Sequence, residues 1–314
     1  IPRAHRCIFV LNELPDLQPR IQVSLFSILE EKEIQIRGFK VRLPLDIQFI
    51  FTSNPEDYTN RGTIVTPLKD RVGSQILTHY PESIEVAKKI TKQESKINSV
   101  LGSKIHIPEV ARDIIEQISF EARESDLVDR KSGVSARMSI TSLQNLVSSA
   151  ERRMIINNEE KTSIRMSDFS SVISSINGKV ELVYEGEEEG AEQVSYNLIS
   201  SAVKSIFNKY FPRIEKLTKP DEISPYDSIL KWFSSKQLVI NDNLKNKDYE
   251  NLLNQVEDAK KLIEKFIPEL NKDDKLFFIE FILWGLESYN KLSILRTNNG
   301  IEYKDPFNNF INKI

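Results

Sequence analysis

The sequence predicts an α/β core at its N-terminal end, followed by helical regions. The continuous apolar run 7–11 is typical of a strand in a parallel sheet whose two faces are both covered, and the largely apolar segment 47–51 reads as a second buried strand. After residue 80, apolar residues recur three and four positions apart, which is the spacing of amphipathic helices. A length of 314 residues is more than one compact core usually contains, so we expect more than one domain.

The first 80 residues alternate between strand and helix. In chain order, we expect a strand over 7–11, a helix over 21–29, a β-hairpin formed by 34–37 and 40–43, a strand over 47–51, a helix that begins at Thr66-Pro67, and a short strand over 75–78. Gly38 can adopt the positive φ of a two-residue hairpin turn, and Pro67 suits the first turn of a helix. The core is therefore a parallel sheet with an inserted hairpin.

The remaining sequence divides into a helical lid (81–178), an acidic linker (179–193) and a helical C-terminal region (194–314). Helices are expected over 84–97, 110–123, 140–155, 194–210, 227–238, 250–267 and 275–294. The linker contains YEGEEEGAE, whose acidic residues and glycines favour a solvated segment, with an acidic docking site as the alternative.

Composition excludes several classes of function. The 43 basic and 46 acidic residues give a net charge of −3, so no basic field favours a nucleic-acid partner. The single cysteine, Cys7, excludes an internal disulfide, and we expect it to be a buried, inert residue. The three histidines share no metal-ligand spacing. The apolar run 276–286 is interrupted by Glu280 and is too short to span a bilayer, so we expect no membrane and a cytoplasmic location.

Polar side chains follow the two predicted core strands. Asn12 and Glu13 come directly after the first, and Asn54 follows the second. Ligands of open parallel sheets bind beyond the carboxyl ends of the strands. There a carboxylate can polarise an attacking water and an amide can orient it, while arginines such as Arg71 and Arg137 can neutralise a transferred phosphoryl group. Helix caps, turn residues and surface ion pairs are the structural alternatives for these residues.

Taken in order, these segments resemble motifs of AAA+ ATPases of the magnesium-chelatase I subunit and MoxR branch. AHRCIFVLNEL (4–14) resembles Walker B, and FTSNPED (51–57) resembles sensor 1. LKDR (68–71) is similar to the arginine-finger motif, and SARMSI (135–140) to the start of the sensor 2 helix. The resemblance covers about residues 1–175 and implies a partial AAA+ core with a helical lid. The region beyond about residue 180 resembles no family.

The resemblance implies a role for each matching residue. Glu13 would activate the hydrolytic water, and Asn54 would hold that water and sense the γ-phosphate. Arg71 would reach the neighbouring subunit's site, Arg137 would contact nucleotide from the lid, and Arg61 would be a second arginine acting in trans.

The inserted hairpin and the Walker B position carry further implications. Arg37, Lys40 and Arg42 would face the ring's inner surface or its substrate, with a plain solvent face as the alternative. Asn12 replaces the usual aspartate. A neutral amide binds a hard cation less well than a carboxylate, so its contribution to Mg²⁺ binding would be weak and indirect.

The implied function is ATP hydrolysis that drives conformational work on a partner protein, with ATP and Mg²⁺ as ligands. The implied assembly is a homo-oligomeric ring, expected to be a hexamer, and the implied partner carries a von Willebrand A-type domain. No G-x-x-x-x-G-K-[ST] phosphate loop occurs in the sequence. Because the sequence begins with Ile1 and enters a strand at once, either a pro-segment was removed or the sequence is cut from a longer chain. We expect the cut, and a fragment that is inactive alone.

Two other functions remain open at this point. A non-hydrolysing regulatory or structural ring subunit would account for Asn12. A σ54-type transcriptional activator has a related hairpin, but the C-terminal region shows no basic recognition helix.

Overall fold

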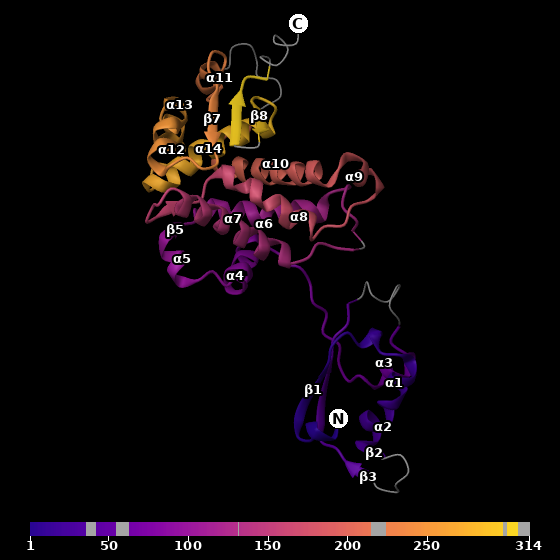
Figure 1. Ribbon diagram of the computed structural model, residues 1–314. Helices are drawn as coiled ribbons and strands as arrows, with labels where there is room; N and C mark the ends of the chain where they lie inside the picture. The colour runs from indigo at the N-terminus through magenta and orange to yellow at the C-terminus, as the bar shows by residue number, and fades with distance from the viewer. Residues whose placement is uncertain (36–41, 55–62, 131, 215–223, 298–299, 307–314) are drawn as a thin grey trace. The chain divides into compact units, whose positions relative to one another are not determined.

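A computed structural model describes residues 1–35, 42–54, 63–130, 132–214, 224–297 and 300–306 (Figure 1). The chain divides into two units, Ile1–His79 and Tyr80–Ile314, and each has its own hydrophobic core. Both strands and helices are present, and helices predominate. The fold is therefore mixed α/β.

The first unit is an α/β structure built on two parallel strands. Its elements are η1 (Pro2–Ala4), β1 (Cys7–Leu11), η2 (Leu14–Asp16), α1 (Pro19–Ser24), α2 (Phe26–Glu31), β2 (Glu33–Gln35), β3 (Arg42–Pro44), β4 (Ile47–Phe51) and α3 (Thr66–Arg71). β1 and β4 pair in parallel from Cys7 opposite Ile47 to Leu11 opposite Phe51. β2 and β3 pair antiparallel, so the described ends of the expected hairpin are strands.

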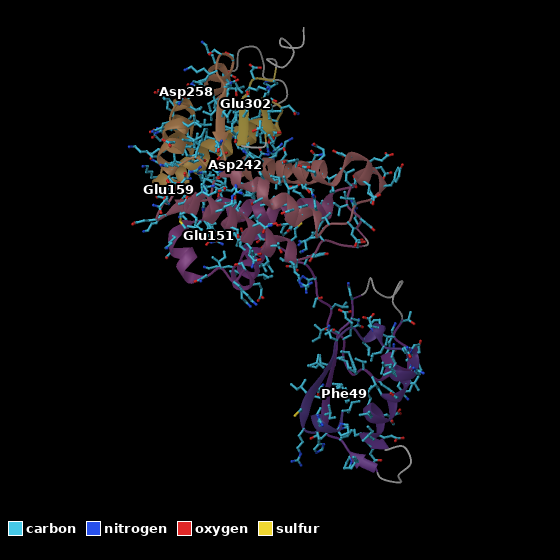
Figure 2. The ribbon with its side chains drawn as sticks, viewed as in Figure 1. Phe49, Glu151, Glu159, Asp242, Asp258 and Glu302 are labelled. Carbon is cyan, nitrogen blue, oxygen red and sulfur yellow. The ribbon has the colours of Figure 1, made fainter. Side chains whose placement is uncertain are left out.

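One face of this sheet packs on the core of the first unit, and the other is open. Leu11 and Phe51 contact a cluster of three buried leucines, Leu14, Leu25 and Leu68. On the same face the ring of Phe49 lies 5.7 Å from that of Phe9 (Figure 2). The alternate residues of the two strands point the other way and are exposed: Ile8 by 64%, Val10 by 55% and Ile50 by 45%.

Three predictions for this unit were wrong. The strands are covered on one face only, and Cys7 is exposed rather than buried. The segment 75–78 is not a strand, because no described strand pairs with it; Ile76 is 90% exposed there. An apolar run alone does not show whether a neighbouring strand or layer is present to cover it.

The second unit is mainly helical. Its elements are α4 (Ile84–Glu94), α5 (Ser99–Lys104), β5 (Ile105–His106), α6 (Glu109–Glu124), α7 (Arg137–Ile156), β6 (Thr162–Ser163), η4 (Met166–Val172), α8 (Ile173–Asn177), α9 (Tyr184–Glu189), α10 (Ala191–Tyr210), α11 (Asp227–Phe233), β7 (Leu238–Asn241), α12 (Asn246–Leu253), α13 (Glu257–Phe266), α14 (Lys272–Ser288), β8 (Ser293–Thr297) and β9 (Gly300–Lys304). α10 packs against both α6 and α14.

The predicted lid and C-terminal region share one core. Buried apolar residues from Ile105 to Tyr303 form a single cluster. The predicted acidic linker contains the helix α9, and a Cβ at its Gly186 would lie 2.6 Å from the carbonyl oxygen of Leu127. The segment 179–193 is thus packed against the lid, because its glycine permits a close backbone approach.

The C-terminal region was predicted to be helical throughout, but it also contains a sheet. β7, β9 and β8 form a three-stranded antiparallel sheet in that order. In β7, Leu238 and Ile240 are buried while Val239 is half exposed, which is the two-residue alternation of a strand. Among the described residues, no helix is both long and apolar enough to span a membrane.

Candidate functional site

The carboxyl ends of β1 and β4 are joined by hydrogen bonds of one residue, Thr52. Its N–H donates to the carbonyl of Leu11 (3.0 Å), and its carbonyl accepts from the N–H of Leu14 (2.9 Å). Its hydroxyl accepts from the N–H of Glu13 (3.0 Å) and donates to Oδ1 of Asn12 (2.6 Å). Asn12 and Glu13 are therefore held beside the segment that leads to Asn54. Sequence reasoning placed Thr52 inside the segment that resembles sensor 1 but gave it no role of its own.

Glu13 has a left-handed backbone, with φ of 53° and ψ of 58°. A residue with a side chain pays about 1–2 kcal/mol for this conformation, and such strain clusters at functional sites. The residue is half-buried, and none of the described residues hydrogen-bonds or ion-pairs with its carboxylate. The carboxylate is thus available to accept a proton or a hydrogen bond from a water molecule.

The two asparagines differ in how their amides are engaged. Oδ1 of Asn12 accepts the hydroxyl of Thr52, whereas the described residues offer the Asn54 side chain no partner. No group of three or more His, Cys, Asp or Glu side chains capable of holding a metal occurs among the described residues. The described residues around Asn12 therefore form no carboxylate cluster for Mg²⁺, although Glu13 and Asn54 fit the binding and activation of water.

Arg71 ends α3 with its guanidinium held by its own unit. Nη2 lies 2.6 Å from a carboxylate oxygen of Glu30, to which Nε donates at 2.8 Å, and Nη1 donates to the carbonyl of Pro67 (2.8 Å). The guanidinium also lies 4.9 Å from the ring centroid of Phe26. This arrangement matches the ion-pair alternative for Arg71. Action in trans would require it to leave Glu30, a partly exposed pair that contributes about 1 kcal/mol or less.

The approach to α3 depends on a buried glutamine that sequence reasoning also missed. Gln22 is fully buried, and its amide donates to the carbonyls of Leu17 (2.8 Å) and Thr63 (3.1 Å). Its Oε1 accepts from the N–H of Val65 (2.9 Å). All of these groups would lose their partner on truncation of Gln22, so it fixes the start of the helix that carries Arg71. The apolar periodicity of 21–29 gave no signal for a buried polar residue.

The remaining predicted residues lie apart from this strand edge in the sequence. Arg137 is the first residue of α7 in the second unit; it is exposed, and no described residue pairs with its guanidinium. Arg37, Lys40 and Arg61 lie outside the described residues. The backbone of Arg42 is paired with that of Gln35.

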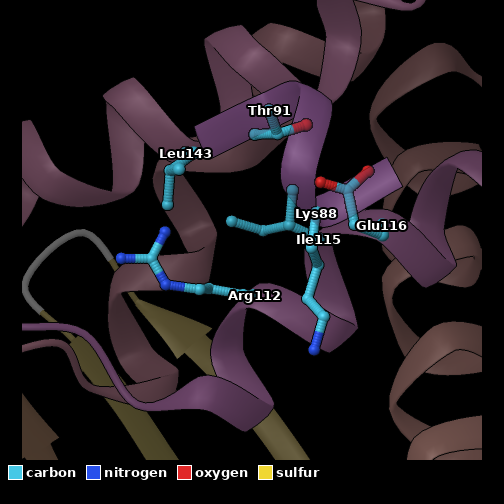
Figure 3. A pocket seen from close by; sticks show the side chains of 6 residues that line it. All are labelled: Lys88, Thr91, Arg112, Ile115, Glu116 and Leu143. Atoms are coloured by element: carbon cyan, nitrogen blue, oxygen red, sulfur yellow. The ribbon is translucent and has the colours of Figure 1, made fainter. Parts of the chain in front are cut away.

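A small cavity lies in the second unit, lined by Lys88, Thr91, Arg112, Ile115, Glu116 and Leu143 (Figure 3). Its volume is about 10 Å³, room for about one water molecule. Lys88 pairs with Asp113 (2.6 Å) and Glu109 (2.8 Å), and burial raises the pKa of Glu116. None of the predicted site residues lines this cavity, and it is too small for a nucleotide.

Comparisons with known proteins identify no family for the chain. No protein-family model matches it, and no curated protein is similar to it. Among solved structures, it is similar to a protein from Cytophaga hutchinsonii described as a "putative ATPase". The two are 20% identical, with 61% of this chain and 64% of that chain covered and a TM-score of 0.25. The chain spans less than two thirds of that protein's length, and at this TM-score the match does not identify a shared fold.

Proposed function

We propose that the chain is part of an ATP-hydrolysing subunit of the AAA+ type, related to the chelatase and MoxR branch. The observation that supports this most is the parallel pairing of β1 with β4, whose carboxyl ends bring the Asn12-Glu13 segment and the 52–54 segment to one edge of the sheet. In AAA+ ATPases the resembling motifs lie at such an edge. The proposal extends to Arg137 contacting nucleotide and to Arg71 acting in a neighbouring subunit.

In the proposed reaction, the Glu13 carboxylate takes the proton from a water molecule as that water attacks the γ-phosphate of ATP. Two observations support this role: none of the described residues pairs with the Glu13 carboxylate, and its backbone is left-handed. Asn54 would hold the same water through its amide. The proposed reaction includes no step through Mg²⁺, because the described residues around Asn12 do not form a site for it.

We also propose a ring assembly, a hexamer by resemblance, and a client that carries a von Willebrand A-type domain. The exposed apolar face formed by Ile8, Val10 and Ile50 is compatible with burial in a larger structure.

The proposal is tested by Glu13→Gln in the polypeptide expressed from the complete reading frame. The amide keeps the size of the side chain but cannot accept the proton, so hydrolysis should fall by at least about 100-fold while ATP binding persists. Glu31→Gln is the matched control, because Glu31 is an exposed glutamate at the end of α2 and should leave hydrolysis unchanged. Hydrolysis at the wild-type rate in Glu13→Gln would refute the assignment.

A non-hydrolysing ring subunit is the second candidate, favoured by Asn12. Because residue 12 is an asparagine, no carboxylate stands at the position expected to assist Mg²⁺. Its amide oxygen also already accepts the hydroxyl of Thr52. Under this alternative the wild-type protein has little turnover, and Asn12→Asp should raise it. If neither the wild-type protein nor Asn12→Asp hydrolyses ATP in the assembled ring, a purely structural role is favoured.

A further inference from the structure

The loop that leads into α7 is fastened to the first residue of the second unit. The buried N–H of Val134 donates to the hydroxyl of Tyr80 at 2.9 Å. Tyr80 directly follows the boundary between the two units, which lies after His79. Only Ser135 and Ala136 separate Val134 from Arg137, the first residue of α7. The hydroxyl of Tyr80 therefore bonds the backbone three residues before α7 begins.

The ring of Tyr80 is fixed by α6. The guanidinium carbon of Arg123 lies 4.0 Å from the ring centroid of Tyr80 and 5.1 Å from that of Phe120. At these distances the guanidinium makes cation–π interactions with both rings. Its buried Nε finds no hydrogen-bond acceptor among the described residues. Tyr80 is thus held by its ring and bonded to the loop by its hydroxyl.

The opposite side of the loop is held by residues 179–193, the predicted acidic linker. The N–H of Asp129 donates to the carbonyl of Glu181 (2.9 Å), and the N–H of Val183 donates to the carbonyl of Leu127 (3.1 Å). Val134 itself forms an antiparallel bridge with Val180. Since the loop is anchored on both sides, loss of one anchor is expected to loosen it locally without unfolding the unit.

We propose that Tyr80 is a positioning residue for Arg137, which it fixes through the N–H of Val134. The inference rests on the proposed function for the role of Arg137 toward nucleotide. The coupling between Tyr80 and the start of α7 can be measured without any ATPase activity.

Amide hydrogen exchange of Tyr80→Phe in the full chain tests the coupling. The phenylalanine keeps the ring on Arg123 and removes only the acceptor of the Val134 N–H. Exchange at Val134 should accelerate by at least about fivefold, the size of one hydrogen bond. It should also accelerate at Met138, whose N–H bonds the carbonyl of Ser135 (2.9 Å) in the first turn of α7. Unchanged exchange at either amide would overturn the proposal.

Tyr184→Phe is the matched control, because Tyr184 is 70% exposed and its loss of a hydroxyl should alter neither amide. Tyr80→Ala provides a stronger perturbation, since it also removes the contact with Arg123. Its exchange at Val134 and Met138 should be at least as fast as in Tyr80→Phe.

In the polypeptide expressed from the complete reading frame, ATP hydrolysis gives a second readout that a purely structural role would not produce. Tyr80→Phe should raise KM for ATP by about fivefold with little change in kcat, the loss expected from one hydrogen bond. In an Arg137→Ala background it should have no further effect, because the residue it positions is gone. An equal effect in both backgrounds would overturn the positioning role. Absence of hydrolysis in every variant, including wild type, would contradict the proposed function, and the exchange data would still decide the coupling.

Discussion

Glu280 is a fully buried carboxylate inside the apolar run of α14. It accepts three hydrogen bonds, from the hydroxyls of Tyr249 (2.6 Å) and Tyr303 (2.9 Å) and from the N–H of Met166 (3.1 Å). These donors come from α12, β9 and η4, so one side chain joins three parts of the second unit. A buried acceptor with three donors is costly to remove, because each donor is left without a partner.

Replacing Glu280 by alanine should therefore destabilise the second unit strongly. We expect a loss of about 3–5 kcal/mol in the free energy of unfolding, because three buried donors are left unpaired at about 1–3 kcal/mol each. Urea denaturation followed by circular dichroism measures this. Glu264→Ala, at an exposed glutamate of α13, should change the free energy of unfolding by less than about 0.5 kcal/mol. Similar losses in the two variants would contradict the role given to Glu280.

The same residue makes stability depend on pH. Burial raises the pKa of Glu280 above the usual 4.5, although hydrogen bonds from Tyr249 and Tyr303 oppose the shift. Below pH 4.5 the carboxyl is protonated in both states. Above it the unfolded chain releases the proton first, so the free energy of unfolding falls with rising pH until the native carboxyl also ionises.

Glu280→Gln should accordingly reduce the slope of stability against pH above 4.5, as measured by urea denaturation at several pH values. Some slope should persist, because burial also raises the pKa of Glu116 and Glu287. A steeper slope in Glu280→Gln than in wild type would show that the native pKa is lowered rather than raised.

At the scale of elements, the contact between α10 and α14 depends on a glycine. A Cβ on Gly285 would lie 2.2 Å from the ring of Phe207 in α10. That ring is fully buried and is surrounded by Phe211, Tyr226 and Phe281, so it has no space to move. The close approach of these two helices therefore requires a residue without a side chain.

Gly285→Ala should lower the free energy of unfolding by about 1–3 kcal/mol through overpacking, although alanine is the better helix former. Gly102→Ala is the matched control, because Gly102 lies in helix α5 with nothing within 4 Å of its added Cβ. It should be neutral or stabilising by up to about 1 kcal/mol. Both are measured by urea denaturation, and a stabilising Gly285→Ala would contradict the packing described.

The elements were predictable wherever local periodicity decides them. The parallel strands 7–11 and 47–51 and the helix beginning at Thr66-Pro67 have the predicted type and nearly the predicted bounds. The predicted helices 227–238 and 275–294 ended inside the first residues of β7 (238–241) and β8 (293–297), and no strand was predicted at either place. These two segments became strands because β9 pairs with both, and such distant pairing leaves no local signal.

At the scale of the whole molecule, the two units differ in how much core they contain. The described first unit has a two-stranded parallel sheet and a cluster of three buried leucines, whereas the second has one continuous core from Ile105 to Tyr303. A two-stranded sheet with so little buried surface is marginal by itself. Stability should therefore reside in the second unit.

Residues 80–314, expressed alone, should unfold in a single cooperative transition in urea. Residues 80–178 alone should show no cooperative transition, because α6 would lose α10, its main packing partner. Cooperative unfolding of 80–178 would show instead that the lid is an independent domain, as the sequence predicts.

The strand-edge residues could be located from sequence because they follow apolar strands, but their surroundings could not. The bonds of Thr52, the left-handed backbone of Glu13 and the pairing of Arg71 with Glu30 all involve residues about 40 positions apart or a local conformation that no motif specifies. Gln22 and Tyr80 have no pattern in the sequence at all, since each is defined only by the groups that it contacts.

The exposure of Cys7 has a practical consequence. It is the single thiol of the chain, and it begins β1 on the same face of the sheet as Phe9 and Leu11, two residues beyond the packed part of that face. A maleimide dye or nitroxide attached there gives a spectroscopic reporter at one known position without any engineered cysteine. Its emission wavelength or its accessibility to a paramagnetic quencher would record when water is displaced from this end of β1 as partners are added.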